Sequence, residues 1–122
     1  MPNTSQGKKL LAEWVKRLGL TDWHIILKEN CRPEDMALQS VEGCTTWVDT
    51  TKSAWIDMLD PAFYPTNAVG RGSDFERCLV HELLHLKLCL VQDVEDDLQS
   101  RYMHQIIDDL ARAFVDAKRC KE

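Results

Sequence analysis

The stretch that decides the fold spans residues 73–91 and reads SDFERCLVHELLHLKLCLV. Its apolar part, from Leu79 to Val91, holds neither glycine nor proline, the two residues that most often interrupt a helix. Ser73 and Glu76 match the capping box, in which a serine at the N-cap and a glutamate three residues later satisfy free backbone N–H groups. The stretch therefore predicts a helix that begins beside Ser73.

A second helix is predicted after this one, from about Val94 to Lys118, with Asp93 at its N-cap. The short break near Gln92 lets the second helix fold back beside the first. Apolar residues three or four positions apart predict the face that the second helix buries. These residues are Leu98, Tyr102, Ile106, Leu110, Ala113 and Ala117.

The first half of the chain predicts one further helix and three strands. Helical spacing of apolar residues predicts a helix from about Lys8 to Leu18, and Gly19 follows as its C-terminal glycine. The order of elements predicts an α+β domain, in which the helices pack on one face of a small three-stranded sheet. The strands are expected at about residues 23–28, 41–49 and 53–59, where β-branched and aromatic residues gather.

Length and composition limit the class of protein. A chain of 122 residues fits a single domain, here residues 1–122, with residues 1–7 as a loose N-terminal tail. The net charge of -5 disfavours nucleic-acid binding, and no apolar run approaches the roughly 20 residues that cross a bilayer. The five cysteines form no Cys-x-x-Cys pair, and the N-terminus lacks an apolar signal segment. We therefore expect a cytoplasmic protein with reduced thiols and no membrane association.

The motif His81-Glu82-Leu83-Leu84-His85 carries the chemistry. On a helix, His81 and His85 lie one turn apart on the same face and can both point at one metal ion. Imidazole nitrogens bind zinc at about 2.0–2.1 Å. Zinc lowers the pKa of a bound water to roughly 7, and Glu82 is placed to take the proton as the water attacks a carbonyl. The motif predicts a Zn2+ site with two histidine ligands and Glu82 as the catalytic base.

A catalytic zinc site needs a third protein ligand. His104 is the first candidate, because it lies on the second helix, where the fold-back brings it level with the histidine pair. Asp108 follows one turn later and is expected to hold the other ring nitrogen of His104. Glu95 is the main alternative ligand, and Asp96 and Asp97 are weaker ones.

The segment from Arg77 to Leu86 resembles the active-site helix of the zincin metallopeptidases. The coarse layout, from about residue 8 to 118, is similar to that of small single-domain zincin-like proteins of phages and bacteria. Those proteins run from a helix and a Trp-containing strand through a short sheet into the motif helix and a closing helix. The resemblance implies zinc binding by His81 and His85, general base catalysis by Glu82, and a bacterial or phage-infected cell as the setting.

The resemblance leaves the third ligand and the subfamily open. Metzincin-like enzymes place a glycine and a further histidine soon after the pair, and residues 88–91 hold neither. Gluzincin-like enzymes use a glutamate on a following helix. SprT-like proteins use a downstream histidine, which His104 resembles in its placement.

The expected function is that of a zinc-dependent hydrolase, a metallopeptidase that acts on a peptide or protein substrate. A chain of this length lacks room for the second subdomain that forms the cleft of large zincins. The groove is therefore expected to be shallow, or completed by a partner chain. The alternative is a non-catalytic module that keeps zinc as a structural ion and binds another protein. A fourth protein ligand would favour the module, and an open fourth position would favour the enzyme.

Overall fold

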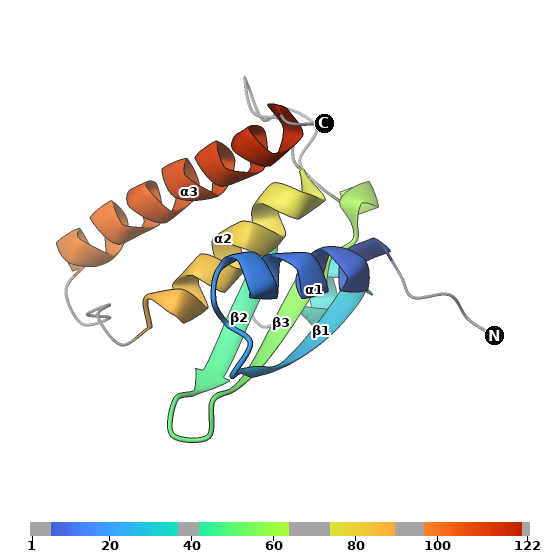
Figure 1. Cartoon of the computed structure of the whole chain (residues 1–122). Coiled ribbons are helices and arrows are strands. Elements are labelled where there is room, and N and C mark those ends of the chain that lie inside the picture. Colours follow the sequence, from blue (N-terminus) through green and yellow to red (C-terminus); the bar gives the residue numbers. More distant parts are fainter. Residues whose placement is uncertain (1–5, 37–41, 64–73, 90–96, 121–122) are drawn as a thin grey trace.

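The computed structural model describes residues 6–36, 42–63, 74–89 and 97–120 (Figure 1). These residues form an α+β fold of three α-helices and one three-stranded sheet, which confirms the predicted class. In chain order the elements are α1 (Gln6–Arg17), β1 (His24–Cys31), β2 (Gly43–Val48), β3 (Ser53–Leu59), α2 (Phe75–Lys87) and α3 (Asp97–Cys120). Two short 3-10 turns, Pro33–Asp35 and Pro61–Phe63, follow β1 and β3.

The last strand in the sequence lies in the middle of the sheet. The strand order is β1-β3-β2, with β1 parallel and β2 antiparallel to β3. A tight turn joins β2 to β3, and Lys52 adopts a positive φ of 52° there. In the described part of the chain β2 therefore hydrogen-bonds to a strand on one side only.

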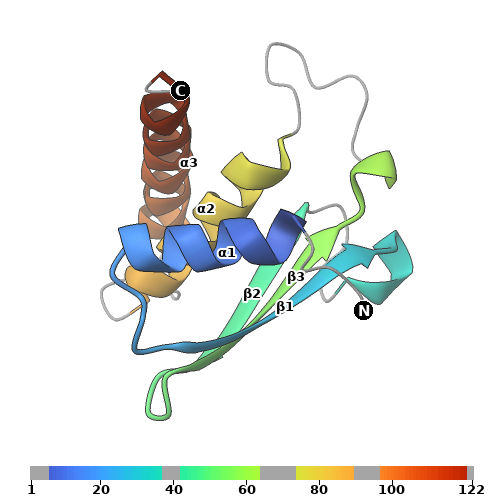
Figure 2. The same cartoon turned by 45° about the vertical axis from the view of Figure 1, so that its right-hand side comes forward.

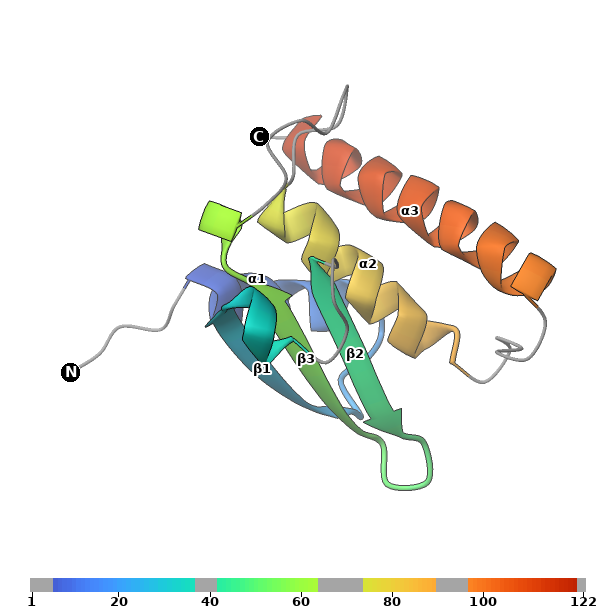
Figure 3. The ribbon, with the colours of Figure 1, turned by 180° about the vertical axis from the view of Figure 1, so that it is seen from behind.

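The helices α1 and α2 cover the same face of the sheet, as the sequence predicts (Figure 2). Seen from behind, the strands lie in front of these two helices (Figure 3). The helix α2 contacts β2, β3, α1 and α3, whereas α3 runs beside α2 on the side away from the sheet. α2 is thus the element that joins all the layers.

The main core lies between the sheet and the helices. Alternate residues of a strand point to the same face, and Ala54, Ile56 and Met58 of β3 all face the helices and are almost fully buried. Leu79, Leu83 and Leu86 of α2 pack against them, with Trp14 and Leu20 at the α1 end. Removing such apolar side chains from water is the main favourable contribution to folding.

The face that α3 buries differs from the predicted one. Ile107, Ala111 and Val115, spaced four residues apart, are almost fully buried against α2. Of the predicted face, Leu98, Tyr102, Ile106, Ala113 and Ala117 are exposed, and Leu110 is half-buried. The physical reason is that α3 carries apolar residues on two faces and packs mainly on α2, so that only one of those faces is covered.

The start of α2 also differs from the prediction. Asp74 is the N-cap residue, and its carboxylate accepts a hydrogen bond from the backbone N–H of Arg77 at 3.2 Å. Ser73 and Asp93, the two predicted caps, lie outside the described residues. Element ends shift by a few residues elsewhere, most of all in β1, which continues to Cys31 through a bulge near Asn30.

Glu76 is nearly buried and joins the ends of three helices. Its carboxylate accepts hydrogen bonds from Trp14 Nε1 of α1 at 2.7 Å and from Lys118 Nζ of α3 at 2.6 Å. Arg119 of α3 adds a third hydrogen bond at 3.1 Å. Burial alone raises the pKa of Glu76, but these donors outweigh burial and hold the pKa below its ordinary value.

Two further findings concern the cysteines and the possibility of a membrane-spanning helix. All five cysteines are free thiols. Among the described residues, no helix combines the length and the apolar character needed to cross a bilayer.

Replacing Glu76 by glutamine is expected to lower the free energy of unfolding at pH 7 by ~2 kcal/mol, because hydrogen bonds to a charged, buried partner are lost. At pH values above 4.5, the ordinary pKa of a glutamate, this carboxylate makes its full contribution to the free energy of unfolding. As the pH falls through the lower pKa of the folded state, the contribution disappears. The difference between wild type and Glu76→Gln should therefore shrink in acid, as measured by denaturant unfolding at several pH values.

Glu13→Gln is the matched control for this prediction. Glu13 also accepts a hydrogen bond from Lys118 but is about a third exposed, so its loss should cost less than about 1 kcal/mol. A difference between wild type and Glu76→Gln that stays constant from neutral pH into acid would contradict the assignment.

Candidate metal centre

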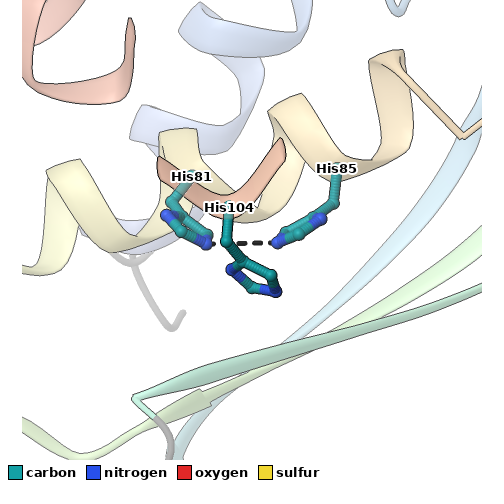
Figure 4. Close-up of side chains that lie close together, drawn as sticks. All are labelled: His81, His85 and His104. Atoms are coloured by element: carbon teal, nitrogen blue, oxygen red, sulfur yellow. Dashed lines mark hydrogen bonds between the residues drawn. The ribbon is translucent and has the colours of Figure 1, made fainter. Parts of the chain in front are cut away.

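Three histidines converge between α2 and α3 (Figure 4). His81 and His85 lie one turn apart on α2, and His104 reaches the same point from α3. One nitrogen of each ring lies within 4.8 Å of the other two, which makes this the one group of metal-ligating side chains found among the described residues. The three histidines could hold a metal ion.

The ring geometry fits this use. The Nε2 atoms of His81 and His85 are 3.1 Å apart. Two nitrogens bound to one zinc ion at 2.0–2.1 Å in a tetrahedral arrangement are about 3.3 Å apart. The ring of His104 lies 4.6 Å from that of His85 and 5.5 Å from that of His81, measured between centroids. At 3.1 Å, the Nε2 atoms of His81 and His85 can share a proton in a hydrogen bond or bind one cation together.

Asp108 holds His81 and not His104, contrary to expectation. Its Oδ1 lies 3.3 Å from Nδ1 of His81, while its Oδ2 accepts a hydrogen bond from Arg112 at 3.4 Å. The reason is the rotation of α3 that buries the Ile107 face and turns Asp108 toward α2. With its proton on Nδ1, His81 presents the lone pair of Nε2 to the cluster.

Burial also favours the neutral form of His81. It lowers the pKa of His81 by more than the carboxylate of Asp108 raises it. A neutral imidazole is the form that binds metal ions. His81 is therefore held in the protonation state that a metal ligand needs.

Glu82 lies in the contact between α2 and β2. Its side chain is 8% exposed, and its Oε1 accepts a hydrogen bond from the Thr45 hydroxyl of β2 at 2.7 Å. Burial raises the pKa of Glu82 to about 7, against the opposing effect of the hydrogen bond from Thr45. A carboxylate with such a pKa can both accept and return a proton near neutral pH.

Gly43 of β2 makes room for this carboxylate. A Cβ atom at position 43 would lie 3.0 Å from Cγ of Glu82 and 3.2 Å from Sδ of Met58. Sequence reasoning missed both Gly43 and Thr45. The available signal was strand alternation, which places residues 43, 45 and 47 on one face of β2, but alternation does not say which helix residue they meet.

Glu42, just before β2, adds a second carboxylate near the cluster. Its Oε2 accepts a hydrogen bond from Sγ of Cys78 at 2.8 Å. Burial and this carboxylate raise the pKa of the Cys78 thiol well above its usual range, so the thiol stays protonated. A protonated thiol is a poor metal ligand, and Cys78 therefore stands outside the cluster.

The structure brings the ring nitrogens of three predicted ligands together, whereas the carboxylate of Glu82 lies against Thr45 of β2. His81, Glu82 and His85 share one helix, and His104 meets the pair from α3. Glu95 and Asp96, the alternative ligands, lie outside the described residues, and the side chain of Asp97 is not described either.

Titration with Zn2+ is expected to load about one ion per chain, because one cluster of three nitrogen donors is present. His81→Ala and His104→Ala should each abolish tight uptake, measured by elemental analysis after gel filtration. His24→Ala, which removes the exposed histidine of β1, is the matched control and should bind as the wild type does. Full uptake by His104→Ala would exclude His104 as the third ligand.

Asp108→Ala is expected to weaken metal affinity by about 10–100-fold, because the ring of His81 loses the partner that orients it. Competition with a chromophoric chelator measures this change. Asp109→Ala removes the neighbouring, exposed carboxylate and should leave the affinity unchanged. Equal affinities of the two variants would show that Asp108 does not support the site.

Comparisons with protein-family models, with curated proteins and with solved structures found no match for this chain.

Proposed function

We propose that this protein is a zinc-dependent hydrolase, and that it acts as a metallopeptidase on a peptide or protein substrate. The observation that carries the proposal is the cluster of three histidine nitrogens from α2 and α3, next to a buried glutamate that follows His81 in α2. Three imidazoles with room for a further ligand are the donor set of catalytic zinc sites. The resemblance of the α2 sequence to the zincin helix supports the same reading.

Zinc is one of the ions that imidazole ligands suit, and when bound it would supply a Lewis acid and lower the pKa of water at the site. His81, His85 and His104 would hold the ion, and Asp108 would fix the ring of His81. These roles follow from the contacts of the side chains described above.

Glu82 supplies the proton transfers. Its carboxylate takes a proton from the attacking water and returns it to the amine that leaves. Thr45 holds one carboxylate oxygen by its hydrogen bond, which leaves the other oxygen for the water. Gly43 allows this arrangement, because any side chain there would push against Glu82.

The strand β2 is the element best placed to hold a substrate. It supplies Thr45 to the site, and within the described residues it has a hydrogen-bonded neighbour on one side only. An extended peptide can add to such an edge through main-chain hydrogen bonds. Such binding needs no second lobe to hold the peptide.

One observation favours the alternative, a non-catalytic module with a structural ion. The three histidines come from two helices, so a bound ion would link α3 to α2 and stabilise their contact. In that case substitutions of Glu82 and Thr45 would change only the stability of the protein.

The test is to incubate zinc-loaded protein with a diverse peptide library and to identify the cleavage products by mass spectrometry. Glu82→Gln is expected to lower kcat by about 100-fold or more while keeping the metal, because the proton acceptor is lost. Thr45→Val should lower kcat by about tenfold through the loss of one hydrogen bond to a charged group. Thr46→Val is the matched control, since Thr46 is exposed on the opposite face of β2 and should leave kcat unchanged.

Two results would contradict the proposal. Zinc-loaded wild type that cleaves no peptide would favour the structural module. Cleavage that persists in Glu82→Gln would come from another residue or from a contaminant.

A further inference from the structure

The apolar face that α3 leaves open forms a stripe along the helix that Asp109 interrupts between Ile106 and Ala113. It consists of Leu98, Tyr102, Ile106, Ala113 and Ala117, which we call the α3 stripe. Leu98, Tyr102 and Ile106 are each more than half exposed. With Phe114 they leave on the order of 400 Å² of apolar side chain in water, a patch as large as monomeric proteins ordinarily expose.

We propose that the α3 stripe binds the α3 stripe of a second copy of this chain, antiparallel and across a two-fold axis beside Asp109 and Leu110. A two-fold contact requires a surface that is complementary to itself. The order of residues along the stripe meets this requirement. Its large side chains lie in the N-terminal half of α3 and its alanines in the C-terminal half.

The register of such a pair follows from the sequence. When Asp109 of one copy stands opposite Leu110 of the other, Tyr102 stands opposite Ala117 and Ile106 stands opposite Ala113. Tyr102 and Ile106 each meet an alanine in this register, which lets the helices approach closely and interdigitate. A parallel pair would instead place tyrosine on tyrosine and alanine on alanine.

A groove at the C-terminal end of the stripe can accept Tyr102 of the second copy. Ala117 and Phe114 of α3, with Trp14 and Leu18 of α1, line a groove of about 240 Å³. A cavity of about 150 Å³ already holds benzene, so this groove has room for an aromatic ring. The antiparallel register brings Tyr102 of the second copy to Ala117, which lies at the mouth of this groove.

The charges beside the stripe are also complementary in this arrangement. Arg101, Asp109, Arg112 and Asp116 flank the stripe on one side. Within about half a turn of the stated register, Arg101 meets Asp116 of the second copy and Arg112 meets Asp109. Within the chain, Asp116 also pairs with Arg77 at 2.7 Å and Arg112 with Asp108 at 3.4 Å. Opposite charges across an interface fix its register and disfavour wrong alignments.

The proposed contact leaves the histidine cluster open. His104 and Asp108 lie on the side of α3 that faces α2, away from the stripe. Association and metal binding are therefore independent properties, and each can be tested in the presence of the other.

The test is analytical ultracentrifugation of the full chain from low micromolar concentration upward. The wild type is expected to form dimers, and Ile106→Asp and Ala117→Glu should each raise the dimer dissociation constant by about tenfold or more. Ile26→Asp is the matched control, because Ile26 is a similarly exposed isoleucine on the open face of the sheet. It should dimerise as the wild type does, and zinc uptake should be equal in all four proteins.

A cross-link tests the register separately from stability. In a Cys120→Ser background, Asp109→Cys lies at the two-fold axis and should give disulfide-linked dimers under mild oxidation, whereas Asp22→Cys should not. A wild type that stays monomeric at all concentrations would overturn the proposal. So would a dimer that survives both stripe variants, or one that Ile26→Asp dissociates.

Discussion

The close approach of α2 to β2 is the constraint on which the other features of the site depend. Gly43 has no side chain, and a Cβ atom there would lie only 3.0 Å from Cγ of Glu82. The hydroxyl of Thr45 then reaches the carboxylate of Glu82 and satisfies a group that burial would otherwise destabilise. Because α2 also contacts α1 and α3, its position against the sheet decides where the histidines meet.

Local patterns were enough to predict the helix α2 and most of the site. The spacing of His81 and His85 fixes their common face on any helix, and the short break after α2 made His104 a reasonable third member. The fold class followed from the order of helix and strand patterns. These features depend on residues close together in the sequence.

Features that depend on tertiary placement were not predictable in the same way. The pairing of Thr45 with Glu82 requires the position of β2 against α2, which no periodicity gives. The buried face of α3 was predicted wrongly, because Ile107, Ala111 and Val115 have the same helical spacing as Leu98, Tyr102 and Ile106. The partner of Asp108 changed from His104 to His81 for the same reason, since it depends on the rotation of α3 about its axis.

The strand order also has a consequence for how the chain folds. The central strand β3 is the last to appear in the sequence, and β1 pairs with β3 alone. The β2–β3 hairpin closes only residues 49–52, whereas pairing of β1 with β3 must close residues 32–52. Shorter loops lose less chain entropy on closure and form faster. The hairpin therefore loses less chain entropy when it forms, and β1 pairs afterwards with the edge of β3 that the hairpin leaves open.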